Sequence, residues 1–243
     1  MILLFTDFGC EGPYVGQMKS VLARYEPGMP VIDLMHDVPA FESKPGAYLL
    51  ASLVVEMPPG AVVVAVVDPG VGSARRALAV QADDRWFLGP DNGLFELVLR
   101  RAETAEIFEI AWCPAKLSPS FHGRDLFAPV AARLCRGDPP DFIRLDADDV
   151  RRPDWPDDWA AAIYIDRFGN VMTGLRASQL PAGARLAARG RELPRLRTFS
   201  DAEPGQAFWY ENAQGLAELA VNQGNAAEIL KLAVGQSITV LQA

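Results

Sequence analysis

The sequence is poor in histidine and cysteine, with two histidines and three cysteines in 243 residues. Cys10, Cys113 and Cys135 form neither an even set nor a CxxC pair, which argues against a disulfide framework and against a thiolate zinc site. There is no HExxH motif and no pair of neighbouring histidines, so we expect no metal site. In a chain with so little imidazole, the position of each histidine is informative.

The sequence also lacks long hydrophobic runs and an excess of basic charge. No apolar run approaches the roughly 18 residues that a membrane span needs, and Met1 opens into MILLF without the basic region of a secretory signal. The net charge is −8 at pH 7 and the arginine pairs are scattered, which argues against a broad surface for nucleic acid or anionic membrane. We expect a cytoplasmic, soluble protein that binds a small molecule, with neither nucleic acid nor membrane as a partner.

The first half of the chain alternates short apolar runs with amphipathic segments. Continuous Val, Ile and Leu runs are typical of strands in a parallel sheet that is covered by helices on both faces. This pattern predicts an α/β fold. The expected elements are strands at 1–7, 31–35 and 61–68, helices at 14–25 and 45–57, a two-stranded ribbon at 77–89, a helix at 92–102, a strand at 105–110 and a helix at 124–135.

The composition and the hydrophobic periodicity of the sequence change after Arg136. Residues 137–159 are rich in Asp and Pro and weak in periodicity, which is typical of a linker. We therefore expect two domains, at 1–145 and 158–243. The second carries short strand candidates, which predict a small β-barrel or sandwich. These candidates are 160–166, 170–175, 184–189, 207–211, 216–221 and 237–241.

Polar residues collect where the expected strands of the first half end. Asp7 follows the first strand, Asp68 opens the segment DPGVGSAR after the third, and His122 lies in the loop SPSFHGRDLF before a helix. Ligands of open α/β sheets bind beyond the C-terminal ends of the strands, so these loops are expected to converge on one crevice. Taken singly, each residue also has a structural interpretation as a turn, a cap or a hydrogen-bonded histidine.

Together the polar residues are suited to activate a water molecule. An Asp, an Arg and a His in one place can orient and deprotonate a water, because imidazole accepts a proton near neutral pH. There is no GxSxG motif and no cysteine in a recognisable nucleophile motif, so direct attack by water is favoured over covalent catalysis. The segment DPGVGS matches neither GxGxxG nor GxxxxGK[ST], which argues against a nucleotide-phosphate cradle.

As a set, the motifs resemble the S-adenosyl-L-methionine (SAM) hydrolase family, also called SAM hydroxide adenosyltransferases, which is related to the bacterial fluorinase and chlorinase. Single motifs are weak, but their shared order and spacing over almost the whole chain are specific. The motifs are TDFG at 6–9, YVGQMKSV at 14–21, HDVP at 36–39, DPGVGSARR at 68–76, GPDNGL at 89–94, FHGRDLFAP at 121–129, IDRFGNVMT at 165–173 and AVNQGNAAE at 220–228.

The resemblance implies a Rossmann-like N-terminal α/β domain and a smaller C-terminal β-barrel domain. It also implies a homotrimer that binds SAM between one subunit's N-terminal domain and its neighbour's C-terminal domain. The implied reaction is attack of water or hydroxide at ribose C5′, which releases methionine and forms adenosine without a cofactor.

Family site residues can be carried over where the motifs match. Asp68, Arg75 and His122 fall on the set that activates water, and Asp7 falls on the carboxylate that binds the ribose diol. The remaining implied binding residues are Phe41, Asp166, Phe168, Asn170 and Phe199, with Asp166 as a partner for the substrate's ammonium.

Three positions depart from the family pattern. Gly12 and Gly174 stand where relatives commonly carry Asp and Asn, and ENAQG at 211–215 replaces a turn similar to Asn-Ser-Ser-Gly. The last departure leaves the methionine-carboxylate contact unassigned. Asn212 and Asn225 are retained as further binding candidates.

Two other functions compete with hydrolysis. A halogenase would act on the same substrate, but halogenases replace the Asp-Arg-His set around a halide pocket and carry an extra loop that this chain lacks. A sensor of SAM or adenosine without catalytic activity would have no need of that set. Product analysis with and without halide distinguishes the three.

Overall fold

The computed structural model describes residues 1–241, so the last two residues of the expected second domain lie outside it. The chain divides into two compact units, Met1–Arg152 and Pro153–Ala243, and each is described by itself. The division falls within the segment expected to be a linker. No helix in the described part of the chain is long and apolar enough to cross a membrane.

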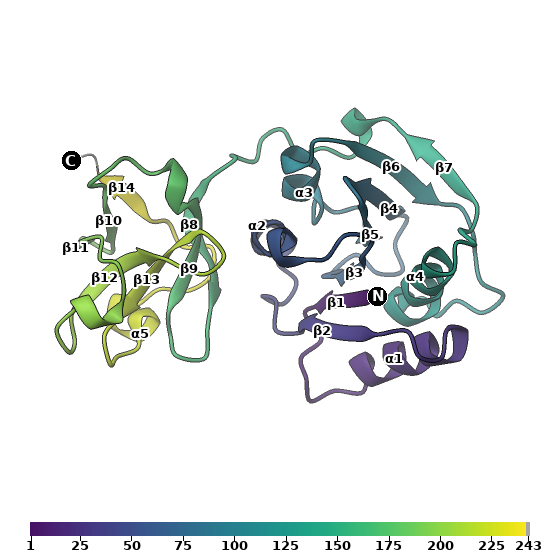
Figure 1. Ribbon diagram of the computed structural model, residues 1–243, viewed down its shortest axis with the longest axis horizontal. Coiled ribbons are helices and arrows are strands. Elements are labelled where there is room, and N and C mark those ends of the chain that lie inside the picture. Colours follow the sequence, from purple (N-terminus) through teal and green to yellow (C-terminus); the bar gives the residue numbers. More distant parts are fainter. Residues whose placement is uncertain (242–243) are drawn as a thin grey trace. The chain divides into compact units, whose positions relative to one another are not determined.

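The first unit is a seven-stranded mixed sheet with helices on both faces (Figure 1). The strand order is β2-β1-β3-β5-β4-β6-β7. The elements are β1 (Ile2–Thr6), α1 (Tyr14–Tyr25), β2 (Val31–Met35), α2 (Ser43–Leu53), β3 (Val62–Val66), β4 (Ala77–Ala82), β5 (Arg85–Pro90), α3 (Glu96–Arg101), β6 (Ala105–Ile110), α4 (Ala128–Cys135) and β7 (Phe142–Leu145).

The central strands are buried on both faces, as their continuous apolar sequences predict. Every residue of β1 and β3 is buried. Ile2 and Leu4 pack on one face with Met18 and Leu22 of α1 and with α4, since side chains alternate along a strand and recur every three to four residues along a helix. Figure 1 shows α2 and α3 on the opposite face of the sheet.

The sheet is mixed: the expected parallel strands are present, and the expected ribbon adds antiparallel ones. Strands β2, β1, β3 and β5 are parallel, whereas β4, β6 and β7 add antiparallel neighbours. The expected ribbon at 77–89 causes the change, because the β4–β5 hairpin reverses the chain through Asp83, whose φ is +51°. A two-residue turn of this kind joins antiparallel strands only.

The prediction that residues 137–159 form a linker is wrong in part. Strand β7 lies inside that segment and pairs with β6 as an edge strand. The ring of Phe142 stacks on Phe108 at a centroid distance of 5.7 Å and lies 5.9 Å from Trp86, so an aromatic cluster joins this strand to the sheet. The unit then ends at Arg151 and Arg152, where the buried carboxylate of Glu96 accepts hydrogen bonds from both residues.

Two expected helices begin later than the sequence suggested. Helix α3 begins at Glu96 rather than at 92, because Asn92 forms a turn in which its Nδ2 donates to Val67 O and its Oδ1 accepts from Leu94 N. Ahead of α4, residues Gly123–Phe127 form a π-helical turn directly after His122. Such turns occur often at functional sites.

The second unit contains two antiparallel sheets that share one apolar core. Their strand orders are β12-β13-β9-β8 and β11-β10-β14. Buried residues of both sheets, such as Leu186 and Trp209, belong to the same cluster. The elements are β8 (Trp159–Ile165), β9 (Val171–Arg176), β10 (Arg185–Ala188), β11 (Arg191–Leu193), β12 (Ala207–Glu211), β13 (Leu216–Val221), α5 (Ala226–Leu230) and β14 (Thr239–Leu241).

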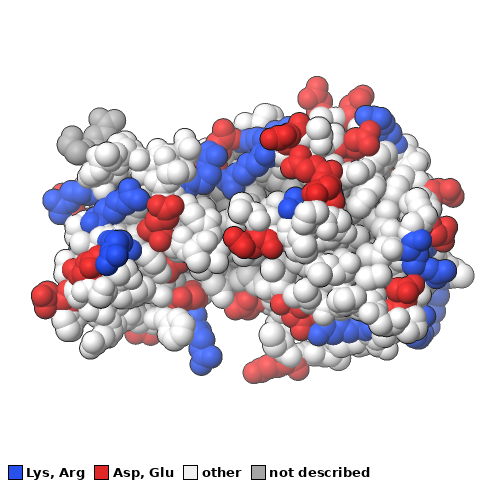
Figure 2. All heavy atoms as spheres, viewed as in Figure 1, with Lys and Arg blue, Asp and Glu red and all other residues white. Residues whose placement is uncertain are grey.

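Short 3-10 turns complete the two units. They lie at Val54–Glu56, Ala147–Asp149, Ala177–Gln179 and Phe199–Asp201. Figure 2 shows Lys and Arg side chains interspersed with Asp and Glu over the face in view, without a massed basic patch on that face.

Candidate active site

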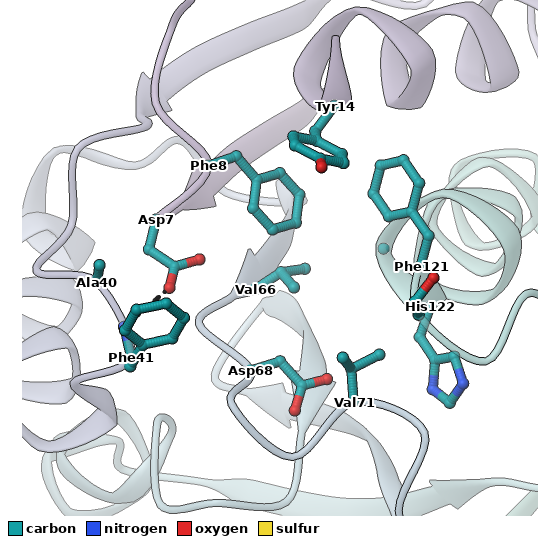
Figure 3. Close-up of a pocket in the computed structure, with 12 residues that line it drawn as sticks. Asp7, Phe8, Tyr14, Ala40, Phe41, Val66, Asp68, Val71, Phe121 and His122 are labelled. Atoms are coloured by element: carbon teal, nitrogen blue, oxygen red, sulfur yellow. Dashed lines mark hydrogen bonds between the residues drawn. The ribbon is translucent and has the colours of Figure 1, made fainter. Parts of the chain in front are cut away.

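A pocket of about 370 Å³ lies at the C-terminal ends of β1 and β3 in the first unit (Figure 3). The loop that holds His122 completes it, so the pocket lies where the strand ends predicted it. Its walls combine polar side chains, among them Asp7, Asp68 and His122, with a larger apolar surface. The lining residues are Asp7, Phe8, Tyr14, Ala40, Phe41, Val66, Asp68, Val71, Ser120, Phe121, His122 and Gly123.

Asp68, Arg75 and His122 form one hydrogen-bonded set. Arg75 Nε lies 2.9 Å and 3.0 Å from the two carboxylate oxygens of Asp68, and Arg75 Nη2 also donates to Oδ2. The same Nη2 lies 3.0 Å from Nδ1 of His122. A guanidinium only donates hydrogen bonds, so Nδ1 accepts and the neutral ring carries its hydrogen on Nε2.

The surroundings of His122 favour its neutral form. Burial and the positive charge of Arg75 lower the pKa of His122 below its ordinary value. Both effects disfavour a second positive charge on the ring. The imidazole therefore stays neutral at pH 7, which is the form that can accept a proton.

A glycine lets the loop of Arg75 and the loop of His122 approach each other. Gly72 has a φ of +80°, and a Cβ at this position would collide with the carbonyl oxygen of Pro119. Only glycine takes this conformation and this contact without strain. The loop that carries Asp68 and Arg75 can thus pack directly on the loop that carries His122.

Asp7 faces the same pocket from the end of β1. Its Oδ2 accepts a hydrogen bond from the backbone N–H of Phe41 at 3.0 Å, and burial raises the pKa of Asp7. Phe41 has a φ of +66° and its side chain is 74% exposed at the pocket. An aromatic residue seldom adopts this backbone conformation, so the Asp7 contact helps to hold a strained residue in place.

Three rings in the first pocket were not predicted as site residues. Phe8, Tyr14 and Phe121 lie with centroids 5.4–5.8 Å apart. Figure 3 shows the three rings together beside Val66. Phe8 and Phe121 fall within the recognised motifs TDFG and FHGRD, and this position in the motifs was the available signal.

His36, the second histidine, is held in a buried hydrogen-bond network away from the first pocket. Thr6 Oγ1 lies 2.8 Å from Nδ1 of His36, and Asp33 Oδ1 lies 3.0 Å from its Nε2. The side chain is buried and is absent from the walls of the pocket that holds His122. His36 thus supports the segment at the end of β1.

A second pocket, of about 630 Å³, lies within the second unit. It brings together four predicted residues, Asp166, Phe168, Asn170 and Phe199, and adds Tyr210 and Glu218, which sequence reasoning missed. Its other lining residues are Val221, Gln223 and Gly224.

The DRFGN turn presents Asp166 in a fixed position. Oδ1 of Asp166 accepts from the backbone N–H of Phe168 at 2.9 Å and of Asn170 at 2.8 Å, and Oδ2 accepts from Asn170 Nδ2 at 2.9 Å. The Phe168 side chain is 71% exposed at the pocket. The turn therefore fixes a carboxylate and leaves an aromatic ring free to contact a ligand.

The two remaining candidates serve the local structure. Asn212 closes the turn between β12 and β13 through Oδ1, which accepts from the backbone N–H of Gln214 and Leu216. Asn225 caps α5 by accepting from the N–H of Glu228 at 3.0 Å. Neither lines the second pocket.

No three His, Cys, Asp or Glu side chains within residues 1–241 come together as a metal site would require. The two pockets instead combine carboxylates, aromatic rings and one imidazole. This arrangement defines a two-unit α/β protein whose polar residues lie at the strand ends of a mixed sheet, with a second polar pocket in a β-rich unit.

The chain belongs to the SAM hydroxide adenosyltransferase family. The family models for the N-terminal and the C-terminal domain match residues 2–144 and 160–239. The resemblance inferred from the sequence motifs is thereby confirmed.

Individual relatives agree with the family assignment. The chain is 39% identical to an (R)-S-adenosyl-L-methionine hydrolase of Thermus thermophilus, covering 99% of each protein. It is 40% identical to a protein of the same name from Salinispora arenicola, covering 97% of this chain and 95% of the relative. A fluorinase of an Actinoplanes species is more distant, at 25% identity over 100% of this chain and 98% of the relative.

A solved structure shares the architecture. The crystal structure of an uncharacterized conserved protein from Thermotoga maritima matches with a TM-score of 0.88 and 30% identity, covering all of both chains.

Proposed function

We propose that this protein is an enzyme that hydrolyses S-adenosyl-L-methionine to adenosine and L-methionine. The observation that carries the proposal is the hydrogen-bonded set of Asp68, Arg75 and His122, of which Asp68 and His122 line one pocket with Asp7. The similarity to SAM hydrolases over nearly the whole chain supports the same substrate.

The leaving group of this reaction does not need to be protonated by the protein. Water oxygen attacks ribose C5′, the C5′–S bond breaks, and its electron pair neutralises the sulfonium, so methionine leaves as a thioether. The water loses one proton, and no oxidant, reductant or organic cofactor enters the balance. The protein must therefore align the water with the C5′–S bond and accept its proton.

The Asp68–Arg75–His122 set supplies these two requirements. A water between Arg75 and His122 would accept from Nη2 and donate to Nδ1, replacing the direct contact of 3.0 Å between these atoms. The ring then takes the proton on Nδ1, while Asp68 holds the guanidinium through Nε. The lowered pKa of His122 keeps the ring ready to accept this proton at pH 7.

Asp7 is suited to bind the ribose. One carboxylate can accept hydrogen bonds from both hydroxyls of a diol. The exposed ring of Phe41 beside Asp7 offers an apolar wall for the sugar or for the base. Both residues line the pocket that holds His122.

The second pocket is proposed to bind the adenine and methionine parts. Asp166 pairs with the ammonium group, while Phe168, Asn170 and Phe199 contact the remainder of the substrate. Asn212 and Asn225 act by holding the turns beside this pocket. The first unit is proposed to be Rossmann-like and the second to be a β-barrel.

We further propose that the protein forms a homotrimer in which one subunit's first pocket and a neighbour's second pocket share a substrate. Activity then depends on self-association. Dilution with sedimentation and assay in parallel tests this, and full activity in a monomer would refute it.

Product analysis tests the proposed function. Purified protein is incubated with SAM of each sulfonium configuration, with and without chloride and fluoride, and the products are separated by chromatography. Adenosine and methionine in equal amounts are expected with or without halide. A 5′-halogenated nucleoside would indicate a halogenase, and intact SAM after hours with excess protein would indicate a sensor.

A further inference from the structure

Glu218 is a buried carboxylate for which the proposed reaction has no role so far. It lies in the middle of β13, where every residue is buried, and it is 3% exposed. Its neighbours along LAELAV are apolar, yet Glu218 lines the second pocket together with Asp166. A carboxylate at a buried strand position destabilises a fold unless its charge is compensated.

The hydrogen-bond partners of Glu218 are neutral. Tyr210 Oη donates to Oε1 at 2.6 Å, and Asn212 Nδ2 donates to Oε2 at 2.8 Å. No Lys, Arg or His is among the described residues that line the pocket. The nearby charge of Asp166 and the burial both raise the pKa of Glu218. The carboxylate is thus held in position without a cationic partner in the pocket wall.

These bonds also determine which polar atoms the pocket offers to a ligand. Tyr210 has one hydroxyl hydrogen and gives it to Glu218, so its oxygen can only accept hydrogen bonds from a ligand. The carboxylate oxygens of Asp166 and Glu218 also only accept when ionised. A primary ammonium carries three donors and a positive charge, which complements this set of acceptors.

We propose that Glu218 is a specificity-determining residue, which makes the second pocket select a ligand that bears a primary ammonium. It does so by its own charge and by orienting the Tyr210 hydroxyl. The inference rests on the proposed function, in which the α-ammonium of SAM is the selected group.

The experiment compares two ligands in three proteins. The ligands are SAM and its analogue with hydrogen in place of the α-ammonium, and calorimetry measures binding to wild type, Glu218→Gln and Glu211→Gln. Glu211 lies next to Tyr210 on β12 but is exposed and outside the pocket, so it is the matched control.

Wild type and Glu211→Gln are expected to prefer SAM to the analogue. In Glu218→Gln the preference should fall roughly tenfold or more, because a charge-assisted contact is lost, while affinity for the analogue changes less than about threefold. A purely structural role predicts equal weakening of both ligands, and that result or an unchanged preference would overturn the proposal.

A second variant covers the case in which Glu218→Gln does not fold. Tyr210→Phe keeps the carboxylate but removes the oriented hydroxyl, so the preference for SAM should fall several-fold. A full wild-type preference in this variant would overturn the inference.

Binding separates this inference from the proposed function. If wild type releases no adenosine from SAM, the proposed hydrolysis is wrong, yet the ratio of the two affinities still tests Glu218. If wild type hydrolyses SAM but the variants discriminate as well as wild type does, only the role of Glu218 is wrong.

Discussion

The two pockets of this protein handle charge in opposite ways. In the first, the carboxylate of Asp68 and the guanidinium of Arg75 neutralise each other, and the pair leaves one imidazole uncharged beside it. In the second, Asp166 and Glu218 share a wall with aromatic rings and without a basic residue among the described lining residues. The first pocket thus compensates one of its two carboxylates, Asp68, within the protein, whereas the second offers two carboxylates that a cationic ligand group would complement.

This difference suggests that the two pockets have different roles. A neutral imidazole held by an ion pair suits proton transfer, because its protonation state is controlled locally. Fixed acceptors around an aromatic surface suit recognition of a cationic substrate. Substitutions in the Asp68–Arg75–His122 set should therefore affect kcat most, whereas substitutions of the proposed binding residues in either pocket should affect affinity.

The largest effect is expected for His122→Ala. Loss of the proton acceptor should lower kcat by roughly 10²–10⁴-fold and leave SAM affinity nearly unchanged. Adenosine formation at saturating SAM and a binding isotherm measure the two quantities. The control is His36→Ala, which should lower the melting temperature and keep kcat within a few-fold, because His36 contacts Thr6 and Asp33 instead. A stable His122→Ala protein with wild-type kcat would remove His122 from the reaction.

The pH dependence of kcat sharpens the same assignment. The neutral ring is the active form, and burial with Arg75 lowers the pKa of His122. Wild-type kcat should thus be constant through pH 7 and fall only when the pH drops through this lowered pKa, below the ordinary histidine value of about 6.5. The acidic limb should be absent from the residual activity of His122→Ala. A wild-type midpoint above pH 7 would contradict the assignment.

An intermediate effect is expected for Asp7→Ala. Loss of the diol acceptor should raise the dissociation constant of SAM by roughly tenfold or more. The 2′-deoxy analogue should bind more weakly than SAM to wild type but about as well as SAM to the variant. Asp138→Ala, which changes an exposed carboxylate outside both pockets, is the control. An equal loss of 2′-deoxy affinity in wild type and variant would place the diol contact elsewhere.

The smallest effect is expected from two substitutions at Phe41, which distinguish backbone strain from the ring's role in binding. Phe41→Gly and Phe41→Ala both remove the exposed ring and should weaken SAM binding equally. Glycine tolerates the φ of +66° and alanine does not, so Phe41→Gly should be more stable than Phe41→Ala by about 1 kcal/mol. Thermal unfolding of both variants measures this difference. Equal melting temperatures would show that the backbone at Phe41 relaxes without its ring.

Most strands and the helix at 14–25 were predictable because their periodicity is local. The bounds of α1, β2, β12 and β13 coincide with those expected from the sequence. β7 and α5 escaped prediction for different reasons. An aromatic stack with distant rings secures β7, while α5 is only five residues long and depends on the Asn225 cap.

Some residues of the candidate site could likewise be predicted from the sequence, and others could not. Asp7, Asp68 and His122 were visible because they follow predicted strands or precede a helix, and the structure gathers them in one pocket. Glu218 was not visible, because LAELAV looks like an ordinary buried strand. Its importance depends on Tyr210, which faces it across the β12–β13 pair, and on Asn212 in the turn between these strands.

The sequence by itself determined the family, the order of most elements and the residue types available for chemistry, since motif spacing and side-chain periodicity depend on neighbours along the chain. Tertiary structure decided which groups meet. The contact between Arg75 and His122 joins residues 47 positions apart; it fixes the tautomer of the neutral ring, and burial together with Arg75 lowers the pKa of the ring. Burial likewise raises the pKa of Glu218, because the pKa and the free hydrogen-bond positions of a side chain depend on what packs around it in space.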